Sequence, residues 1–343
     1  MAIDPASAEQ VAGALLEYLS TALRAGEIRF AEPPERVGRG LDTHIYAFRL
    51  VGEGLDPAWT GPLVLRLYPT SNQGAKAERE GEVQRFAAEH GYPALVPLAL
   101  ETRAEPFGLP LMLMERVDGA PMLELMGRSP LTIPGLLRKM GALHVALHRL
   151  PLGGCPLSAD GPLVERRLVE FRERIERSAV RGLDDALGWL ERHKAIVTSE
   201  QPALLHNDFH PLNILIDRRG RATVLDWSDA MVGDRHHDIG RTVGVFNVAW
   251  IAAGSALERR ALRPGGGWLA NRYLAAYRRH VPIDRDRLRY WEALQAFHGW
   301  LQLRELEDPA FRTEVGARSD SIESLPEGFA AFMERYFWRR ARW

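Results

Sequence analysis

The chain has 343 residues, of which 46% are hydrophobic, and its formal net charge is −1. The length predicts about two domains with a sizeable core, and the near-zero charge argues against nucleic acid or an anionic membrane as a partner. The single cysteine, Cys155, excludes a disulfide scaffold and a cysteine-based zinc site, and it suits a reducing cytosol.

The N-terminal segment has the pattern of an amphipathic helix. It carries acidic residues and no basic start, which argues against a signal peptide. The sequence contains no run of about 18 apolar residues, so we expect no transmembrane span and no stable membrane association. These features predict a cytoplasmic protein.

The first third of the chain is predicted to form a small sheet with one helix. Segments rich in β-branched, aromatic and other apolar residues predict strands at 45–51, 63–68, 96–102 and 111–117. The charged segment 75–90 predicts a surface helix, which Gly91 and Pro93 end.

Helical patterns dominate after residues 118–121. The segment 133–150 places Leu136, Met140, Leu143 and Leu147 on one helical face. Two charged helices are expected at roughly 162–178 and 182–198, followed by a short hairpin over 213–227. The sequence therefore predicts an α+β protein with a small β-rich N-terminal lobe, 1–117, and a larger, mainly helical C-terminal lobe, 118–343.

The segment 206–217, HNDFHPLNILID, concentrates polar residues directly before a predicted strand. In one interpretation, His206, Asp208 and His210 alternate on one strand face and bind a metal ion. A second group, His236, His237 and Asp238, would complete a metal-dependent phosphohydrolase site. Pro211 fits a loop better than a strand, however, and this interpretation leaves Asn213 and Asp226 without a role.

In the second interpretation, His206, Asp208 and Asn213 have the spacing of a kinase catalytic loop. Asp208 would accept the proton of an attacking hydroxyl. Asn213 would offer Mg²⁺ an amide oxygen, and Asp226, at the end of the second hairpin strand, would offer a carboxylate.

The segments HNDFHPLNILI, VLDW and GDRHHDIG resemble the aminoglycoside phosphotransferase and choline kinase family. The chain has Asn207 where that family favours Gly, and Arg235 where Pro is usual. The resemblance implies a bilobal protein-kinase-like fold that uses ATP, with GTP as the alternative, together with Mg²⁺. It also implies that Asp238 anchors the backbone of the catalytic loop.

The resemblance further implies a nucleotide site in the first lobe. Its residues would be Gly38, Gly40, Arg66, Glu80, Met114, Glu115 and Val117. The glycines would let backbone amides approach the phosphates, and Arg66, inside an apolar strand, would need a partner such as Glu80. Glu78 and Glu82 are alternative partners. The simpler alternatives are a plain hairpin turn for the glycines, a surface ion pair for Arg66, and core packing for Met114.

The sequence predicts different roles for the individual histidines. We expect His206 to orient the loop, and we leave His210 open between packing and contact with the substrate. His144 and His148 are interpreted as structural helix residues, and His236 and His237 as loop residues.

The predicted function is transfer of a nucleotide γ-phosphoryl group to a hydroxyl of a small molecule, with Asp208 as the catalytic residue. Residues 251–343 contain 16 Arg, no Lys and 12 acidic residues, a difference of +4, which argues against a polycationic acceptor. A group of aromatic residues could either contact an acceptor or pack helices together: Trp250, Tyr273, Tyr277, Trp291, His298 and Trp300.

Two alternative functions remain. The first is a nucleotide-binding, pseudokinase-like sensor. The second is a protein kinase, although the sequence has no Ala-Pro-Glu segment to support it. The basic C-terminal segment predicts a solvated helix, with docking to a membrane or a partner as the alternative. The oligomeric state is not predicted.

Overall fold

The structure is a computed structural model that describes residues 3–23, 26–37, 43–158, 161–198, 201–248, 256–307 and 328–342, with side chains from 264 onward in the sixth range. The chain divides into two compact units. Unit 1 comprises Met1–Pro121, Gly154–Pro156 and Ile214–Ser228. Unit 2 comprises Met122–Gly153, Leu157–Asn213 and Asp229–Trp343.

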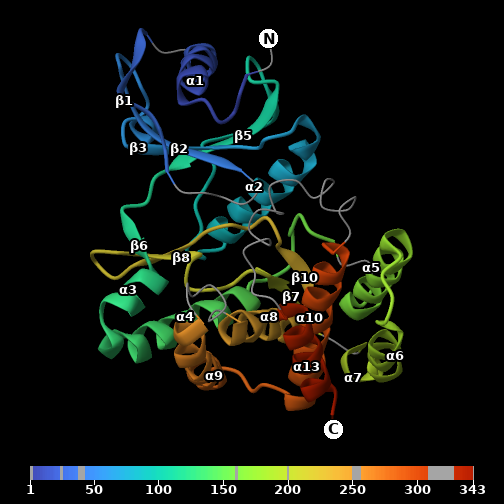
Figure 1. The fold of residues 1–343 in the computed structure, drawn as a ribbon. Helices are drawn as coiled ribbons and strands as arrows, with labels where there is room; N and C mark the ends of the chain where they lie inside the picture. Colours follow the sequence, from blue (N-terminus) through green and yellow to red (C-terminus); the bar gives the residue numbers. More distant parts are fainter. Residues whose placement is uncertain are drawn as a thin grey trace. The chain divides into compact units, whose positions relative to one another are not determined.

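Unit 1 is built on a five-stranded antiparallel sheet in the order β1-β2-β3-β5-β4 (Figure 1). A second sheet has the order β6-β8-β9, and β8 and β9 form the predicted hairpin. The elements of unit 1 are α1 (Ala8–Ala22), β1 (Ile28–Arg36), β2 (His44–Gly52), β3 (Pro62–Leu67), α2 (Gly74–Glu89), β4 (Ala99–Ala104), β5 (Leu109–Glu115), β6 (Gly119–Pro121), β8 (Ile214–Asp217) and β9 (Ala222–Val224), with short 3-10 turns at Pro57–Trp59 and Ser71–Gln73.

The alternation of side chains along β3 explains how the large sheet positions a charged residue. Leu63, Leu65 and Leu67 are fully buried in one hydrophobic cluster with α1. Each contributes about 2 kcal/mol of hydrophobic stabilisation. Because neighbouring residues of a strand point to opposite faces, Arg66 faces away from this cluster and reaches Glu80 on α2.

Unit 2 is mainly helical and contains a two-stranded antiparallel ribbon, β7-β10. Its elements are α3 (Met122–Arg128), a 3-10 turn (Pro130–Thr132), α4 (Ile133–His148), α5 (Leu163–Ser178), α6 (Asp184–His193), α7 (Ala195–Thr198), β7 (Pro202–Leu205), β10 (Met231–Asp234), α8 (Arg235–Val248), α9 (Ala256–Arg278), α10 (Arg285–Glu305) and α13 (Phe329–Ala341) (Figure 1). The segment 206–213 follows β7 directly. Helix α8 begins where β10 ends and packs on β7, which brings the first turn of α8 beside that segment.

Most of the aromatic residues singled out in the C-terminal part of the sequence lie in the core of unit 2. Tyr273, Tyr277, Trp291 and Trp300 are all buried, so the expectation that they pack helices together is confirmed. Trp250 lies outside the described residues. Helix α13 buries one face against α10, chiefly through the side chains Phe332, Met333, Tyr336 and Phe337. The apolar face of this C-terminal helix is thus used inside the unit.

The predicted elements of the first third are confirmed, with ends shifted by a few residues. Strand β1 was expected only as the strand that precedes Gly38, and strands β6, β7 and β10 were not predicted. The lobes 1–117 and 118–343 remain a prediction, while the contact-based unit 1 extends its first segment to Pro121 and includes the β8–β9 hairpin. The expectation that His236 and His237 are loop residues is wrong, because both are buried in the first turn of α8.

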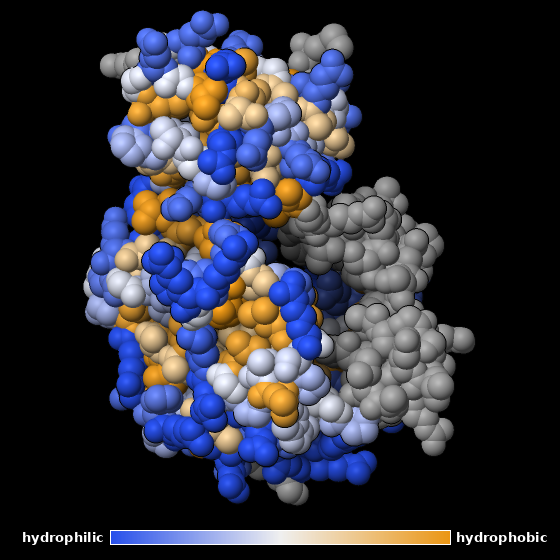
Figure 2. All heavy atoms as spheres, turned by 90° about the vertical axis from the view of Figure 1, so that its left-hand side faces the viewer, coloured by the Kyte–Doolittle hydropathy of each residue, from blue (hydrophilic) through white to orange (hydrophobic). Residues whose placement is uncertain are grey.

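The surface carries only scattered hydrophobic residues where it can be described. Figure 2 shows one face, on which small hydrophobic groups lie among hydrophilic residues. The large hydrophobic side chains that are most exposed are Leu131, Leu212 and Val96, which come from different segments. No helix among the described residues has the length and apolar composition needed to cross a membrane.

Candidate active site

Unit 1 contains a buried cluster of charges around Arg66. This residue is 9% exposed, and its guanidinium donates to the Glu80 carboxylate, to Asp226 Oδ1 at 3.2 Å and to Thr43 Oγ1 at 3.2 Å. The hydroxyl of Tyr68 donates to the second oxygen of Glu80 at 2.8 Å. The predicted pairing of Arg66 with Glu80 is therefore confirmed, and the pair is buried rather than a surface pair.

The electrostatics of this cluster keep Arg66 charged. Burial alone would lower the pKa of Arg66, but the nearby Glu80 and Asp226 carboxylates outweigh it and raise the pKa above its usual value. The alternative partners Glu78 and Glu82 are exposed on α2. The cluster thus holds Arg66 as a cation in one position, between the buried Glu80 carboxylate and the more exposed Asp226 carboxylate.

Asp226 is the exposed member of the cluster. Its side chain is 41% exposed, and its Oδ1 also accepts from Ser228 Oγ at 2.9 Å. Its φ of 61° lies in the left-handed region, which Asp tolerates better than most residues. Backbone held in this region is often found at functional positions, and here it presents a carboxylate at the end of the β8–β9 hairpin.

The loop 206–213 of unit 2 is organised around Asp208. The amide nitrogen of Asn213 donates to the backbone oxygen of Asp208 and to its Oδ2, both at 3.0 Å. His210 Nε2 lies 3.2 Å from the same Oδ2, and Arg241 Nη2 lies 3.7 Å from Oδ1. His210, which the sequence left open, therefore contacts the predicted catalytic carboxylate.

These neighbours determine the charge of Asp208. Burial by itself would raise the pKa of Asp208, but the hydrogen bond and charge of His210, followed by the charges of Arg241 and His206, lower it to about 2. The carboxylate is therefore ionised at any physiological pH. An ionised carboxylate only accepts hydrogen bonds, so it can orient a hydroxyl group.

The orientation of Asn213 suits a magnesium ligand. Its side-chain nitrogen is used by Asp208, which leaves the side-chain oxygen for a ligand. Amide and carboxylate oxygens are the protein atoms that Mg²⁺ prefers. The donor types of Asn213 and Asp226 therefore fit this ion.

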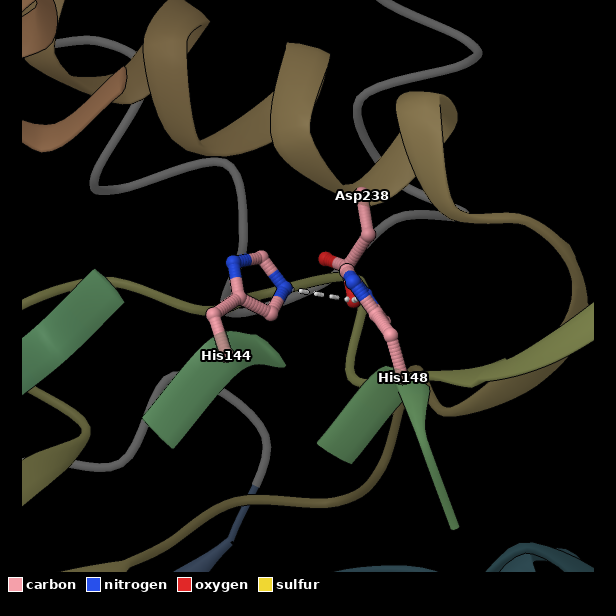
Figure 3. A group of neighbouring side chains, drawn as sticks. All are labelled: His144, His148 and Asp238. Atoms are coloured by element: carbon pink, nitrogen blue, oxygen red, sulfur yellow. Dashed lines mark hydrogen bonds and ion pairs between the residues drawn. The ribbon is translucent and has the colours of Figure 1, made fainter. Parts of the chain in front are cut away.

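A second carboxylate, Asp238, holds the loop in place. Its two oxygens accept from the backbone N–H groups of His206 at 2.7 Å and Asn207 at 3.0 Å. The predicted anchoring of the loop backbone by Asp238 is confirmed. His144 and His148 of α4 also direct their Nε2 atoms at Asp238 Oδ2, at 3.0 and 3.3 Å (Figure 3).

The outer nitrogens of these two histidines are also occupied. The Tyr273 hydroxyl lies 2.6 Å from His144 Nδ1, and the Tyr277 hydroxyl lies 2.8 Å from His148 Nδ1. If each tyrosine donates to Nδ1, each neutral imidazole carries its proton on Nε2. His148 then donates this proton to Asp238 Oδ2, while His144 Nε2 lies 3.0 Å from the same oxygen without meeting the geometry of a hydrogen bond. Burial and the adjacent His144 lower the pKa of His148 to about 4, in agreement with a neutral ring.

This group also has the spacing of metal ligands, because one ligand atom from each of His144, His148 and Asp238 lies within 4.8 Å of the others. Both oxygens of Asp238, however, accept backbone N–H groups, and both imidazoles are held by tyrosines. Hydrogen bonding therefore accounts for the arrangement, and the expectation that His144 and His148 are structural is consistent with it.

The ligand set of the phosphohydrolase alternative does not converge among the described residues. His236 directs Nδ1 at Asp234 Oδ1, 2.7 Å away, and His237 Nε2 lies 2.8 Å from Gln295 Nε2. Each ring therefore has a contact of its own, and neither belongs to a group of possible metal ligands with Asp208.

The remaining predicted nucleotide residues are placed as follows. Gly38 and Gly40 lie outside the described residues. Met114 is 8% exposed, and its sulfur accepts from Gln84 on α2, so it packs between sheet and helix. Glu115 is exposed and Val117 half-buried beyond it, and their roles remain predictions.

Several residues of these clusters were not predicted from the sequence, notably Arg241, Thr43 and Tyr68. Arg241 lies three residues after Asp238, a spacing that puts both on one side of a helix. That spacing could have indicated Arg241 had α8 been predicted to begin before Asp238.

Comparison with known proteins identifies the family. The family model "Phosphotransferase enzyme family" matches residues 37–291. None of the curated proteins compared with the chain matches it.

The chain also resembles solved structures over nearly its whole length. A candidate aminoglycoside phosphotransferase from Ralstonia eutropha is 20% identical, with a TM-score of 0.67, and the match covers 96% of this chain and 98% of that one. A thermostable mutant of aminoglycoside phosphotransferase APH(4)-Ia is 18% identical, with a TM-score of 0.60 and coverage of 95% and 98%. Amicoumacin kinase hAmiN is 14% identical, with a TM-score of 0.59 and coverage of 95% and 92%. At these identities the likeness supports the fold, a β-sheet region and a helical region of the protein-kinase-like type, and the family model, which matches most of the sequence, shows that the chain belongs to the phosphotransferase enzyme family.

Proposed function

We propose that the protein transfers the γ-phosphoryl group of a nucleoside triphosphate to a hydroxyl of a small molecule. The observation that carries this proposal is the loop 206–213. There an ionised Asp208 is held by Asn213, and Asp238 fixes the loop backbone. Phosphoryl transfer needs a carboxylate that orients the attacking hydroxyl and oxygen ligands for a metal ion, and the chain has both.

Asp208 is the proposed catalytic residue. With a pKa of about 2 it is a weak base, so it orients the hydroxyl in the ground state. It receives the proton only as the oxygen–phosphorus bond forms and the hydroxyl becomes acidic, which is compatible with the loose transition state of phosphoryl transfer. Its hydrogen bonds to Asn213 and His210 restrict the carboxylate to one orientation.

The residues of unit 1 supply the nucleotide contacts in this proposal. Arg66, held by Glu80, contacts the phosphates, and backbone groups near Glu115 and Val117 bind the adenine edge. Asn213 and Asp226 would hold Mg²⁺, which when bound neutralises charge on the phosphates.

The similar proteins support the choice of nucleotide and acceptor class. Amicoumacin kinase hAmiN was crystallised with AMP-PNP and Ca²⁺, and an APH(4)-Ia mutant with ADP and hygromycin B. The aminoglycoside 2'-phosphotransferase-IIIa mutant was crystallised with GDP. We therefore propose ATP, with GTP as the alternative, and a small-molecule acceptor.

The test is ADP release with a panel of aminoglycosides, macrolides, amino alcohols, sugars and hydroxy acids. Asp208→Ala should lower turnover by roughly 10²- to 10⁴-fold, the usual effect of losing a general base, while Mg-ATP still raises the melting temperature. Asp185→Asn, at an exposed position of α6, is the matched control and should keep the parental rate. Parental turnover in Asp208→Ala would refute the assignment. Mg-ATP binding without turnover of any acceptor would favour the sensor alternative.

A further inference from the structure

A cavity of about 250 Å³ lies in unit 2 between α8, α10 and α13. Most of its lining is apolar or aromatic, including Val245, Val248, Leu303, Phe329, Met333 and Tyr336. The polar lining residues are Arg241, Gln295, His298 and Gln302. Small-molecule sites commonly combine an apolar lining with a few polar groups in this way.

Arg241 connects this cavity to the proposed catalytic residue. It lines the cavity, and its Nη2 lies 3.7 Å from Asp208 Oδ1, which is too far for a hydrogen bond. Its Nε is buried and has no hydrogen-bond partner in the described part of the chain. A guanidinium has five N–H donors, so Arg241 can donate to a ligand while it remains near Asp208.

The charge of the cavity has one sign among the lining residues that the structure describes: they include Arg241 and no Asp or Glu. Behind the wall, Arg167 donates to His298 Nδ1 at 3.2 Å. Burial, followed by the guanidinium groups of Arg167, Arg174 and Arg241, holds the pKa of His298 well below its usual value. Arg167 and Arg174 are paired with Glu170 and Glu305, so the positive charge at this wall comes from Arg241, which favours an anionic group beside it.

We infer that this cavity binds the acceptor and that the acceptor is an anionic hydroxy compound with an apolar body. In this arrangement Arg241 binds the anionic group, Asp208 binds the hydroxyl, and the apolar body fills the space between α10 and α13. The assignment of Asp208 rests on the proposed function. Because Arg241 and Asp208 are so close, the hydroxyl and the anionic group must be only a few bonds apart, as in 2- or 3-hydroxycarboxylates.

A second cavity, of about 240 Å³, does not meet these requirements. Its lining includes Arg278, Arg285, Arg289 and Arg340, but no residue of the loop 206–213. Arg340 pairs with the buried Glu292 at 3.1 Å. This cavity is cationic as well, so Arg278 provides a matched control for the effect of removing one positive charge.

The experiment compares alkyl and phenyl 3-hydroxy acids, their methyl esters and aminoglycosides as acceptors in the full-length protein. We expect kcat/KM to be roughly 10- to 100-fold higher for an acid than for its ester, the effect of one charge-assisted hydrogen bond pair. Arg241→Gln should abolish this preference, mainly by raising KM for the acid, while the ester is affected much less. Arg278→Gln should preserve the preference.

Binding of the same acids by isothermal titration separates this inference from the proposed function. Binding that requires Arg241, without phosphorylation, would support the ligand class and contradict phosphotransfer. Phosphorylation of polycations in preference to acids would support phosphotransfer and overturn the ligand class. The inference would also be overturned by equal use of acid and ester, by a preference that survives Arg241→Gln, or by the absence of binding of any acid.

Discussion

The two carboxylate clusters, one in each unit, are built from similar groups but differ in what they leave accessible. Around Asp238, two backbone N–H groups and two imidazoles surround a carboxylate that is completely buried. In the Arg66 cluster, Glu80 is equally buried, but the second carboxylate, Asp226, has a side chain that is 41% exposed.

The difference shows how the exposure of a carboxylate distinguishes a structural anchor from a candidate binding site. A buried carboxylate whose oxygens all accept hydrogen bonds stabilises one conformation of its neighbours. A carboxylate that shares a buried cation yet remains accessible can bind a ligand without first losing its structural partners. The cluster that most resembles a metal site by distance, His144–His148–Asp238, is thus the anchor. Substitutions in each cluster can therefore separate anchoring from ligand binding.

The largest effect is expected from replacing Asp238. Asp238→Asn puts an NH₂ group against a backbone N–H, so we expect a loss of about 3–5 kcal/mol in the free energy of unfolding, as for other broken buried charge networks. Asp226→Asn, in the open cluster, should cost less than about 1 kcal/mol but abolish the thermal stabilisation by Mg-ATP. Urea unfolding and thermal shift measure both variants. Equal stability losses in the two would show that the clusters do not differ in this way.

A smaller effect is expected from Glu80→Gln. The variant keeps the hydrogen-bonding shape but removes the charge facing Arg66, so the free energy of unfolding should fall by about 2 kcal/mol. The KM for ATP should rise roughly tenfold, one lost charged contact, with little change in kcat. Glu78→Gln, on the exposed side of the same helix, is the control. An unchanged KM would mean that Arg66 needs no charged partner to contact the phosphates.

The smallest effect concerns the pH dependence of stability. Because the pKa of His148 is lowered to about 4 in the folded state, the unfolded chain binds more protons below the ordinary histidine pKa of about 6.5. His148 therefore does not lower the free energy of unfolding above pH 6.5, and it destabilises the fold as the pH falls from 6.5 towards 4. Between neutral pH and pH 5, His148→Gln should lose about 1–2 kcal/mol less stability than the parent. A slope identical to that of the parent and of the control His280→Gln would contradict the buried, neutral assignment.

The residues that act locally were predictable from the sequence. Asp208 and Asn213 are five residues apart in one loop, and Arg66 stands out as a charge inside an apolar strand, so spacing and alternation were sufficient. The short strands β7 and β10 were missed because each has only four residues, too few for periodicity to distinguish a strand from a loop.

The residues that act over long sequence distances were not predictable. His144 was correctly interpreted as structural, but its partners Asp238 and Tyr273 lie on helices about which spacing within α4 says nothing. The role of His210 could not be predicted because it depends on the orientation of its ring, which is set by the path of the loop. Arg241 was missed because its significance comes from a cavity formed by three helices that only tertiary packing brings together.

The anchoring of the loop by Asp238 has a consequence for the order of folding. The bond between His148 and Asp238 spans 90 residues of sequence, and that between His144 and Tyr273 spans 129. Contacts of such separation form late, because the entropy of closing long loops is lost before they stabilise anything. The loop 206–213 should thus acquire its native geometry only when α4, α8 and α9 have assembled, so that protection of the His206 and Asn207 amides from hydrogen exchange would report the completion of unit 2. A partly folded chain, even one that already binds nucleotide through its sheet, would then be unable to carry out the chemistry.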